Sequence, residues 1–348
     1  MYPPNERGYT VDVVELTRDM CAIPSITNDE KAIVDFVHQL LTQKGYEVSL
    51  QTVGGDERRQ NLLAIVPGVK PEIMLTTHLD TVPPFIPPTD SEDGEWLWGR
   101  GVCDAKGIAA SMIVAGDRLR EGGENRFALL FVVGEETCSD GAKKAADNFA
   151  PSVRYFIDGE PTDMKLVSAM KGAMQFELEV EGKAGHSAYP ESGHSAVHAL
   201  VHDVENLLQT DWPQDGDVGE TNLNIGTIEG GVAPNVHAPF ARASCMMRTA
   251  TDAKKLETQL MSTVGEKTKV SIKSQSSPLH LHVVEGRESC VVSFGSDVPY
   301  LLPLGTPLLV GPGSILDAHT SHEKVKKSDL RDAVVLYADL VTSLLKDG

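Results

Sequence analysis

The order of the expected strands and helices predicts an α/β fold with a second, inserted domain. Over most of the 348 residues, short apolar strands alternate with amphipathic helices, which is typical of a sheet covered by helices. The middle of the chain instead follows the order β-α-β-β-α-β, which is typical of a ferredoxin-like domain. We therefore expect one discontinuous α/β domain, residues 1–167 plus 279–348, interrupted by a ferredoxin-like α+β domain at residues 168–278.

The first domain is expected to begin with a helix near Thr27. Thr27 and Glu30 have the spacing of a capping box, in which each side chain bonds the other residue's backbone N–H, and Gly45 ends the helix. Its apolar residues recur with a helical period, at Ile33, Phe36, Val37, Leu40 and Leu41. Further elements are strands at 61–66, 73–77, 127–133, 154–157 and 308–310, and helices at 107–120 and from about 328 onward.

The inserted domain is expected to open with a strand at 175–181, where apolar and acidic residues alternate strictly. Phe176, Leu178 and Val180 share one face while glutamates occupy the other, as in a half-exposed strand. A helix at 195–208 follows this strand. The pattern is completed by strands at 221–228, 240–248 and 267–274 and a helix at 252–264.

The acidic composition narrows the possible partners. The formal net charge is −19 and the sequence pI is about 4.9, whereas a nucleic-acid-binding protein needs a basic face to neutralise phosphates. An anionic membrane surface is disfavoured for the same reason. The five scattered cysteines form no Cys-x-x-Cys pair, and we find neither a signal pattern nor a bilayer-length apolar run, so we expect a reduced, cytoplasmic protein.

Five short stretches of the chain contain residues that can bind a metal ion. Four of them follow an expected strand, and the ligands of an α/β sheet bind at the carboxyl ends of its strands. The fifth stretch, in which glycines flank Asp104, precedes a helix. Each stretch alone has a structural explanation, such as a helix cap or a turn carboxylate, but their order and common placement favour one site. The candidate residues are His78, Asp80, Asp104, Glu135, Glu136, Glu160, His319 and His322.

The residue types divide these side chains between ligands and helpers. His78 and Asp80 share a face of an extended segment, so one ring nitrogen can bind metal while the carboxylate orients the ring. Asp104 has two oxygens and can bridge two cations about 3.5–4 Å apart. If their segment is extended, Glu135 and Glu136 point in different directions, and one can bind metal while the other serves as general base. Nitrogen and oxygen donors without a thiolate suit Zn2+ and permit Co2+ or Mn2+.

With these residues in this order, the chain resembles the co-catalytic zinc amidohydrolases and metallopeptidases, the family of acetylornithine deacetylase, succinyl-diaminopimelate desuccinylase and aminoacylase. The resemblance spans nearly the whole chain. It implies a zinc-peptidase-like α/β catalytic domain with two Zn2+ per subunit. It also implies that His78, Asp104 and Glu160 hold one ion. Asp104, together with Glu136 and His319, is implied to hold the other.

The same resemblance implies roles for the neighbouring residues. Glu135 corresponds to the general base that takes a proton from the bridging water, and Asp80 corresponds to the residue that orients the first histidine. The Gly-Pro-Gly-Ser run at 311–314, followed by an Ala-His pair, resembles the acetylornithine deacetylase branch most closely. This favours His319 over His322 as the last ligand, a choice that the residues alone leave open.

In this family the inserted domain is a lid that typically dimerises, so the resemblance implies a homodimer. The Gly-His-Ser-Ala-Tyr-Pro segment at 185–190 matches a lid loop whose histidine crosses into the partner's active site and hydrogen-bonds the scissile carbonyl oxygen. The resemblance thus implies this role for His186. Arg248 can clamp a substrate α-carboxylate and Asn235 can contact the substrate, although both residues equally suit structural contacts within the lid.

These inferences predict an enzyme that hydrolyses the amide bond of an N-acyl amino acid. N-acetylornithine, a substrate of arginine biosynthesis, is the expected compound, and succinyl-diaminopimelate desuccinylase or dipeptidase activity is the alternative within the class. A non-catalytic metal-binding scaffold is the alternative from another class. The presence of Glu135 beside a full ligand set argues against the scaffold.

Overall fold

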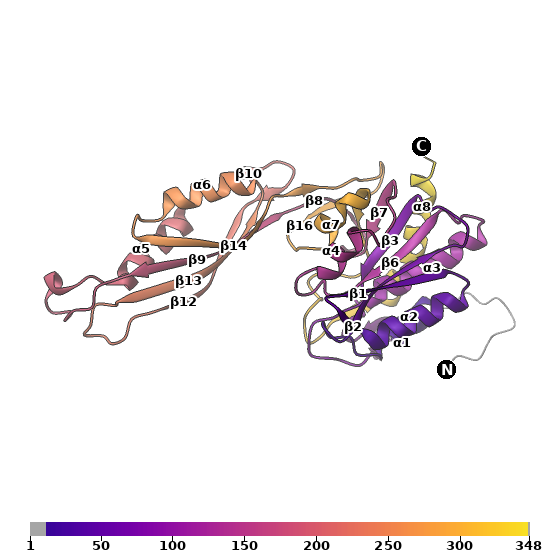
Figure 1. Cartoon of the computed structure of the whole chain (residues 1–348), viewed down its shortest axis with the longest axis horizontal. Coiled ribbons are helices and arrows are strands. Elements are labelled where there is room, and N and C mark those ends of the chain that lie inside the picture. The colour runs from indigo at the N-terminus through magenta and orange to yellow at the C-terminus, as the bar shows by residue number, and fades with distance from the viewer. Residues whose placement is uncertain (1–11, 347–348) are drawn as a thin grey trace. The chain divides into compact units, whose positions relative to one another are not determined.

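The structure is a computed structural model that describes residues 12–346 and divides them into two compact units (Figure 1). The first unit comprises residues 12–167, Leu281–Cys290 and 296–346, and the second comprises Ser168–His280 and Val291–Gly295. Residues 279–280 and 291–295 thus group with the second unit, although the sequence pattern assigned them to the first domain. Among the described residues, no helix is both long and apolar enough to cross a membrane.

The first unit is built on a six-stranded mixed sheet, and the predicted α/β class is confirmed. Four of its strands run parallel, in the spatial order β6, β3, β7 and β17. The other two strands, β2 and then β1, extend the sheet beyond β6 in antiparallel pairing. The bounds are β1 Glu47–Val53, β2 Asp56–Ile65, β3 Ile73–His78, β6 Phe127–Val132, β7 Tyr155–Asp158 and β17 Thr306–Leu309. The sequence pattern missed β1, an edge strand whose residues are mostly exposed or half-buried.

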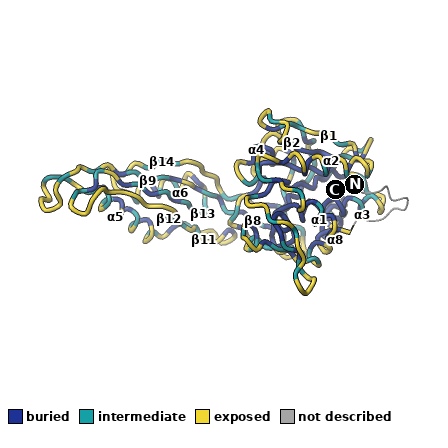
Figure 2. The backbone as a smooth tube through the Cα atoms, turned by 90° about the horizontal axis from the view of Figure 1, so that it is seen from below, coloured by how far each residue is buried: buried dark blue, intermediate teal, exposed yellow. Residues whose placement is uncertain are grey.

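The core of the first unit lies between its central strands and its helices. Every residue of β3 and β6 is buried. The tube in Figure 2 is largely dark blue in the interior of the first unit. Helix α3 packs against both α1 and α8. Gly116 lets α3 also lie close to the sheet, because a Cβ there would lie 2.7 Å from the Tyr46 hydroxyl and 3.1 Å from the ring of Phe127 in β6. The helices are α1 Val13–Cys21, α2 Lys31–Gln43, α3 Lys106–Glu121, α4 Asp140–Ala146, α7 Val298–Leu301 and α8 Lys327–Leu344.

The predicted capping box at the start of α2 is wrong. The helix begins at Lys31, and its N-cap Glu30 makes no capping hydrogen bond with its side chain. The Thr27 hydroxyl instead donates to Asp80 Oδ2 at 2.8 Å, and Glu30 accepts from the backbone N–H of Asn28. Because the helix begins at Lys31, Thr27 lies before the N-cap, and its hydroxyl forms a charge-assisted hydrogen bond within the site.

The second unit contains a four-stranded antiparallel sheet in the order β12-β13-β9-β14, with helices α5 and α6 packed on it. The strands follow the predicted β-α-β-β-α-β order along the chain, with the first and third strands in the centre. The alternating apolar residues of β9, including Phe176 and Leu178, are buried as expected. The bounds are β9 Gly172–Glu181, α5 Ala196–Gln209, β12 Asn222–Gly230, β13 Phe240–Thr249, α6 Ala253–Thr263 and β14 Thr268–Ser276.

The remaining elements are short. One three-stranded sheet joins β4, β5 and β18, another joins β15, β8 and β16, and β10 pairs with β11. Their bounds are β4 Thr89–Asp90, β5 Trp96–Trp98, β8 Leu166–Met170, β10 Gln214–Asp215, β11 Gly219–Glu220, β15 Leu279–His280, β16 Ser289–Val292 and β18 Lys324–Lys326. Two 3-10 helices are η1 Pro190–Ser192 and η2 Leu302–Leu304.

Candidate active site

The carboxyl ends of four neighbouring parallel strands carry the candidate ligands of the first unit. His78 is the last residue of β3, Glu136 follows β6, Glu160 follows β7 and His319 lies in the segment after β17. Because these strands are adjacent and parallel, their ends meet at one edge of the sheet. Asp104 reaches the same edge from the loop that precedes α3.

The His78 ring is buried, and its contacts indicate a cation. Its Nδ1 lies 3.0 Å from the backbone carbonyl oxygen of Asp80, and because a carbonyl only accepts, Nδ1 carries the proton. Its Nε2 lies 3.0 Å from Asp104 Oδ1 and 4.0 Å from Glu160 Oε1. A neutral ring would therefore point a lone pair at a carboxylate oxygen. Either a proton or a metal ion must lie between them.

A second group forms around the other oxygen of Asp104. His319 Nε2 lies 3.3 Å from Asp104 Oδ2 and 2.7 Å from Glu136 Oε2. Asp104 thus faces a different histidine with each of its oxygens. Among the described residues, two groups have ligand atoms within 4.8 Å of one another: His78, Asp104 and Glu160 form one, and Asp104, Glu136 and His319 form the other.

The electrostatics of this edge favour bound cations. Burial raises the pKa of Glu160 well above its ordinary value, and the Glu135 and Asp104 carboxylates raise it further. Burial lowers the pKa of His78, but hydrogen bonds with the carboxylates of Asp104 and Asp80 outweigh this effect and raise the pKa overall. Without a metal, a proton on the ring therefore takes the place of a cation. Glu136 Oε1 is buried without a hydrogen-bond partner. Buried carboxylates at such density are costly unless a positive charge compensates them.

The donor set also fits the coordination of the expected metals. Ligand atoms bound at 2.0–2.2 Å to a tetrahedral ion lie roughly 3.3–3.6 Å apart. The distances from His78 and His319 to the oxygens of their groups span 2.7–4.0 Å and bracket this value. All donors are nitrogen or oxygen, as Zn2+, Co2+ and Mn2+ accept. The residues therefore fit two divalent cations.

Glu135 and Glu136 lie in a turn and not in an extended segment, which corrects the expected geometry. The turn begins at Gly134, which has φ of 80° and whose carbonyl accepts from Ser139 at 2.8 Å. The side chains still diverge, because Glu136 joins a ligand group whereas Glu135 joins neither. Burial raises the pKa of Glu135 well above its ordinary value, with the Asp297 carboxylate among the contributing charges.

Asp80 connects the first histidine to this turn. Its carboxylate is fully buried and accepts from the backbone N–H groups of Glu135 and Glu136, each at 3.2 Å. Oδ1 of the same carboxylate lies 3.5 Å from His78 Nδ1. Asp80 thus orients the ring chiefly through its carbonyl oxygen, and its carboxylate fixes the position of the two glutamates. The bond from Thr27 was missed by sequence reasoning because its spacing matched a helix cap.

The two candidate histidines near the end of the chain have different surroundings. His319 joins a ligand group and has φ of 63°, a backbone conformation that few non-glycine residues adopt. His322 is exposed, and its ring is T-shaped to the Trp98 ring, with 6.2 Å between the ring centroids. It belongs to neither ligand group.

The predicted substrate-binding residues lie in the second unit, and the chain brings only two of them together. The backbone N–H of Ser187 donates to Asn235 at 3.0 Å, and His186 is bridged to Val236, so the exposed loops of His186 and Asn235 lie side by side. Arg248 lies at the other end of β13. Eight residue steps of extended strand, or about 27 Å, separate it from Phe240, the end of the strand nearest these loops.

Two buried carboxyl groups near the site were not predicted. Asp158 ends β7, and burial raises its pKa well above the ordinary value, with Asp297 adding to the effect. Burial also raises the pKa of Asp297 to about 7, and its Oδ1 has no hydrogen-bond partner. Asp158 could have been noticed, since it follows an apolar strand as the ligands do. Asp297 has no comparable signal in the sequence.

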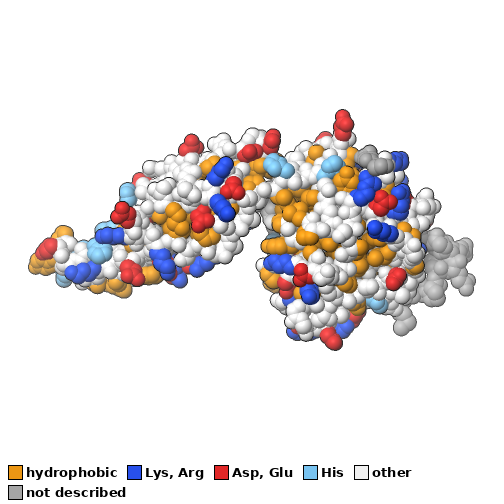
Figure 3. All heavy atoms as spheres, turned by 45° about the horizontal axis from the view of Figure 1, so that its top comes forward, with side chains coloured by type: hydrophobic (Ala, Val, Ile, Leu, Met, Phe, Trp, Pro, Cys, Tyr) orange, Lys and Arg blue, Asp and Glu red, His pale blue; other side chains and the backbone are white. Residues whose placement is uncertain are grey.

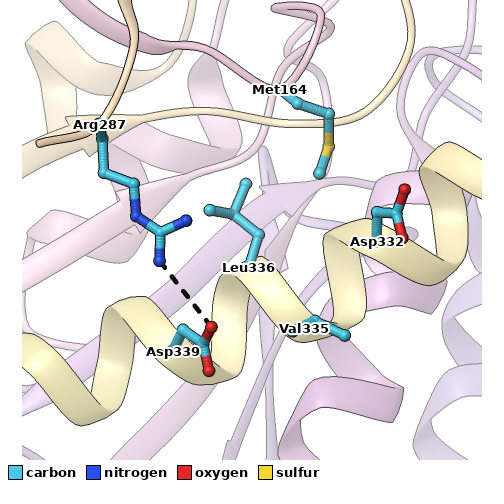
Figure 4. A pocket seen from close by; sticks show the side chains of 6 residues that line it. All are labelled: Met164, Arg287, Asp332, Val335, Leu336 and Asp339. Carbon is cyan, nitrogen blue, oxygen red and sulfur yellow. Dashed lines mark ion pairs between the residues drawn. The ribbon is translucent and has the colours of Figure 1, made fainter.

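A surface pocket of about 320 Å3 lies elsewhere in the first unit (Figure 4). Arg287 and Asp339 face each other across it, with 3.9 Å between Nη2 and Oδ2. None of the predicted site residues lines this pocket. The lining residues are Met164, Arg287, Asp332, Val335, Leu336 and Asp339.

Known proteins resemble the chain over nearly its whole length. A family model described as Peptidase family M20/M25/M40 matches residues 74–343. A probable carboxypeptidase of Aspergillus terreus is 37% identical over 372 aligned positions, covering 94% of this chain and 85% of that protein. A peptidase M20 domain-containing protein of Schizosaccharomyces pombe is 35% identical over 340, covering 95% and 84%. The crystal structure of a tripeptidase from Staphylococcus aureus shares the fold, with a TM-score of 0.80 at 20% identity over 96% of this chain and 98% of that one.

Proposed function

The chain belongs to peptidase family M20/M25/M40, and from this premise we propose that it is a two-metal hydrolase of linear amide bonds. One observation carries the proposal: two ligand groups share Asp104, and Glu135 lies beside them without joining either. Two Zn2+ ions are the proposed cofactors, with Co2+ or Mn2+ as possible substitutes, because the donors are nitrogen and oxygen.

Glu135 is the proposed general base. Cations held by the ligand groups would supply Lewis acidity, which lowers the pKa of water and polarises an amide carbonyl. Glu135 removes the proton from the attacking water and delivers it to the leaving amine nitrogen. Its backbone N–H and that of the ligand Glu136 are both bound by Asp80, so the base and the ligand keep a fixed relation.

The proposed substrate carries a free α-carboxylate, as a short peptide or an N-acyl amino acid does. Arg248 is half-buried on β13 and forms no ion pair with another described residue. Its guanidinium is therefore available to a carboxylate, for which its planar fork is well suited. The Aspergillus terreus relative is named a probable carboxypeptidase, which supports a substrate with a free C-terminal carboxylate.

A homodimer formed through the second unit is proposed, with His186 donating a hydrogen bond to the substrate carbonyl oxygen in the partner's site. The unpaired edge strand β12 exposes Ile228, and the neighbouring helix α5 exposes Val201 and Leu208. Apolar side chains on the surface of this unit are visible in Figure 3. An exposed strand edge flanked by apolar side chains is suited to pairing with a second copy. The separation of His186 and Arg248 within one chain supports a site completed by two chains.

Two finer activities compete within this proposal. The 311–314 run, Gly-Pro-Gly-Ser, favours deacetylation of N-acetylornithine through its resemblance to that branch of the family. The names of the curated relatives favour peptide cleavage next to a free C-terminal carboxylate. Both reactions hydrolyse an amide beside an α-carboxylate, so the same residues would serve either of them.

A substrate panel tests the proposal. Zinc-loaded protein is offered acetylornithine, acetylmethionine, succinyl-diaminopimelate and simple dipeptides, and the best substrate is repeated with its carboxylate amidated. We expect turnover that a chelator abolishes and Zn2+ restores, and loss of that turnover on amidation. Two bound ions without turnover of any compound would instead indicate a non-catalytic metal-binding scaffold.

A further inference from the structure

Glu323 is a buried acidic residue that belongs to neither ligand group and is not the proposed base. It lies four residues after His319, immediately before β18, and its side chain is inaccessible to solvent. A buried carboxylate at this position requires partners that compensate its charge. Its partners lie more than 200 positions earlier in the chain, in the loop that carries Asp104.

The Glu323 carboxylate binds that loop at four points. Its Oε1 accepts the backbone N–H groups of Gly101, Cys103 and Asp104 at 2.8, 3.1 and 3.2 Å. Its Oε2 accepts from Arg100 Nη1 at 2.5 Å. Three converging backbone N–H groups form a concave anion site, and this chain fills it with its own carboxylate. One of the three donors is the backbone of the shared ligand itself.

Glu323 holds the end of the loop that carries Asp104, while the backbone N–H of Arg100 donates to the Ile86 carbonyl at the other end. Residues 99–104 form neither helix nor strand, and Gly101 has φ of 87°. A Cβ at Gly101 would lie 2.6 Å from Lys106 Cε, so the backbone path is confined as well as left-handed. Both oxygens of Asp104 must face defined histidines, and this orientation follows from the backbone to which the side chain is attached.

We propose that Glu323 is a positioning residue for Asp104, coupling the segment that carries His319 to the loop that carries the shared ligand. The inference rests on the proposed two-metal function. Because Asp104 serves both ligand groups, loss of Glu323 should weaken both metal positions together. Loss of His319 should weaken only its own position. If the Glu323 carboxylate only stabilised the fold, its loss would lower the stability of the whole unit and would not act specifically on metal affinity.

Glu323→Gln is the principal variant. The amide keeps one oxygen for the backbone N–H groups but places an NH2 against Arg100, so two donors face each other. Glu323→Asp keeps the charge but shortens the side chain by one methylene, and it serves if the glutamine variant does not fold. Asp117→Asn is the matched control, because it breaks the largely buried Lys44–Asp117 pair, 2.5 Å between Nζ and Oδ2, which contacts no ligand.

The measurement is the affinity of the full-length, chelator-stripped protein for Zn2+, by competition with a chromophoric chelator, with Co2+ absorption spectra and the melting temperature in parallel. We expect Glu323→Gln to lose about 10–100-fold in affinity at both positions, the usual effect of removing a residue that orients a ligand. Glu323→Asp should lose less. Asp117→Asn should lower the melting temperature without changing either affinity or the Co2+ spectrum.

Two results would overturn the inference. Wild-type affinity at both positions in both Glu323 variants would show that Asp104 keeps its orientation without this carboxylate. An equal loss of affinity in Asp117→Asn would show that any destabilisation of the unit weakens metal binding. If the wild-type protein itself fails to bind two ions, the proposed function and this inference fall together, whereas two ions bound with unaltered variants contradict the inference alone.

Discussion

The ligand edge of the first unit and the paired loops of His186 and Asn235 in the second unit contain predicted site residues in opposite physical settings. At the ligand edge, His78, Asp104 and Glu160 are almost completely buried, and ligand atoms from distant loops lie within 4.8 Å of one another. In the second unit, His186 and Asn235 are exposed and their loops are joined by backbone pairing.

This difference shows which roles a single chain can reveal. Buried carboxylates and imidazoles must compensate one another or bind a cation, so their arrangement limits the chemistry that is possible. Exposed side chains have no such requirement, and their roles depend on what approaches them. The ligand edge therefore supports a metal site by itself, whereas the function of His186 depends on substrate and on a second copy of the chain.

The largest expected effect is that of Glu135→Ala at the buried edge. Removal of the base should lower kcat by about 10²–10⁴-fold. Metal content should stay at the wild-type level, because Glu135 joins neither ligand group. Elemental analysis and turnover of the best panel substrate measure the two quantities.

His78→Ala is the control for this prediction, since it should lose metal as well as activity. If Glu135→Ala retained most of its turnover, the base would be misassigned. If it lost its metal, Glu135 would be a ligand and not a base.

His186→Ala tests the exposed side of the comparison. Loss of an oxyanion donor should lower kcat by about 10²–10³-fold with metal content unchanged. His194→Ala is the control, because this neighbouring histidine has no proposed role. Mixing Glu135→Ala and His186→Ala chains should restore part of the activity, since one of the two sites in a mixed dimer would be complete.

No recovery of activity on mixing, with subunit exchange verified by mass spectrometry, would mean that His186 does not act in the partner's site. Wild-type turnover of His186→Ala alone would remove it from the mechanism.

The pH dependence of metal binding is a smaller effect. Hydrogen bonds with Asp104 and Glu136 raise the pKa of His319 to about 10, so the ring holds a proton at neutral pH unless a metal replaces it. Metal binding must displace that proton, and the apparent affinity for Zn2+ should therefore rise as the pH rises from 6 to 8. The expected slope is at most about tenfold per pH unit for each proton displaced.

Calorimetry in buffers of different ionisation enthalpy measures the released protons directly. If the affinity for Zn2+ did not change with pH and no proton were released, metal binding would not displace a proton from His319.

The smallest expected effect concerns Asp297. Burial raises the pKa of Asp297 to about 7, so between its ordinary value near 3.8 and 7 the folded protein binds a proton that the unfolded chain has released. The free energy of unfolding should therefore fall as the pH rises through this window. In Asp297→Asn this contribution is absent, so the variant should gain stability relative to wild type at pH 8 and not at pH 4. Urea unfolding of chelator-treated protein at both pH values makes the comparison, and an equal difference at the two pH values would contradict it.

Local sequence patterns predicted most of the fold, and their failures have physical causes. In β9, α2 and α8 one face of the element is buried, which requires apolar residues at a regular period, and this period is visible in the sequence. Both missed elements are short. Helix α1 spans nine residues, although its buried residues, including Val13, Leu16 and Met20, recur with a helical period, and β1 is a seven-residue edge strand that is mostly exposed or half-buried.

The ligand set could be predicted because its members end a strand, lie in a segment that follows one, or lie in the loop before a helix. The contacts that orient the set could not, because they join residues far apart in the chain. Thr27 bonds Asp80 across 53 positions, and Glu323 bonds Asp104 across 219. Local periodicity contains no information about such pairs. The placement of Arg248 at the end of β13 away from the His186 loop likewise follows from strand register and not from motif spacing.

Anomalous diffraction from zinc-loaded crystals, recorded above and below the zinc absorption edge, tests the two-metal site most directly. We expect two anomalous peaks per chain, one among His78, Asp104 and Glu160 and the other among Asp104, Glu136 and His319, with Glu135 bound to neither. A single peak, or a second peak that does not contact Asp104, would contradict a site with two ions that share this carboxylate.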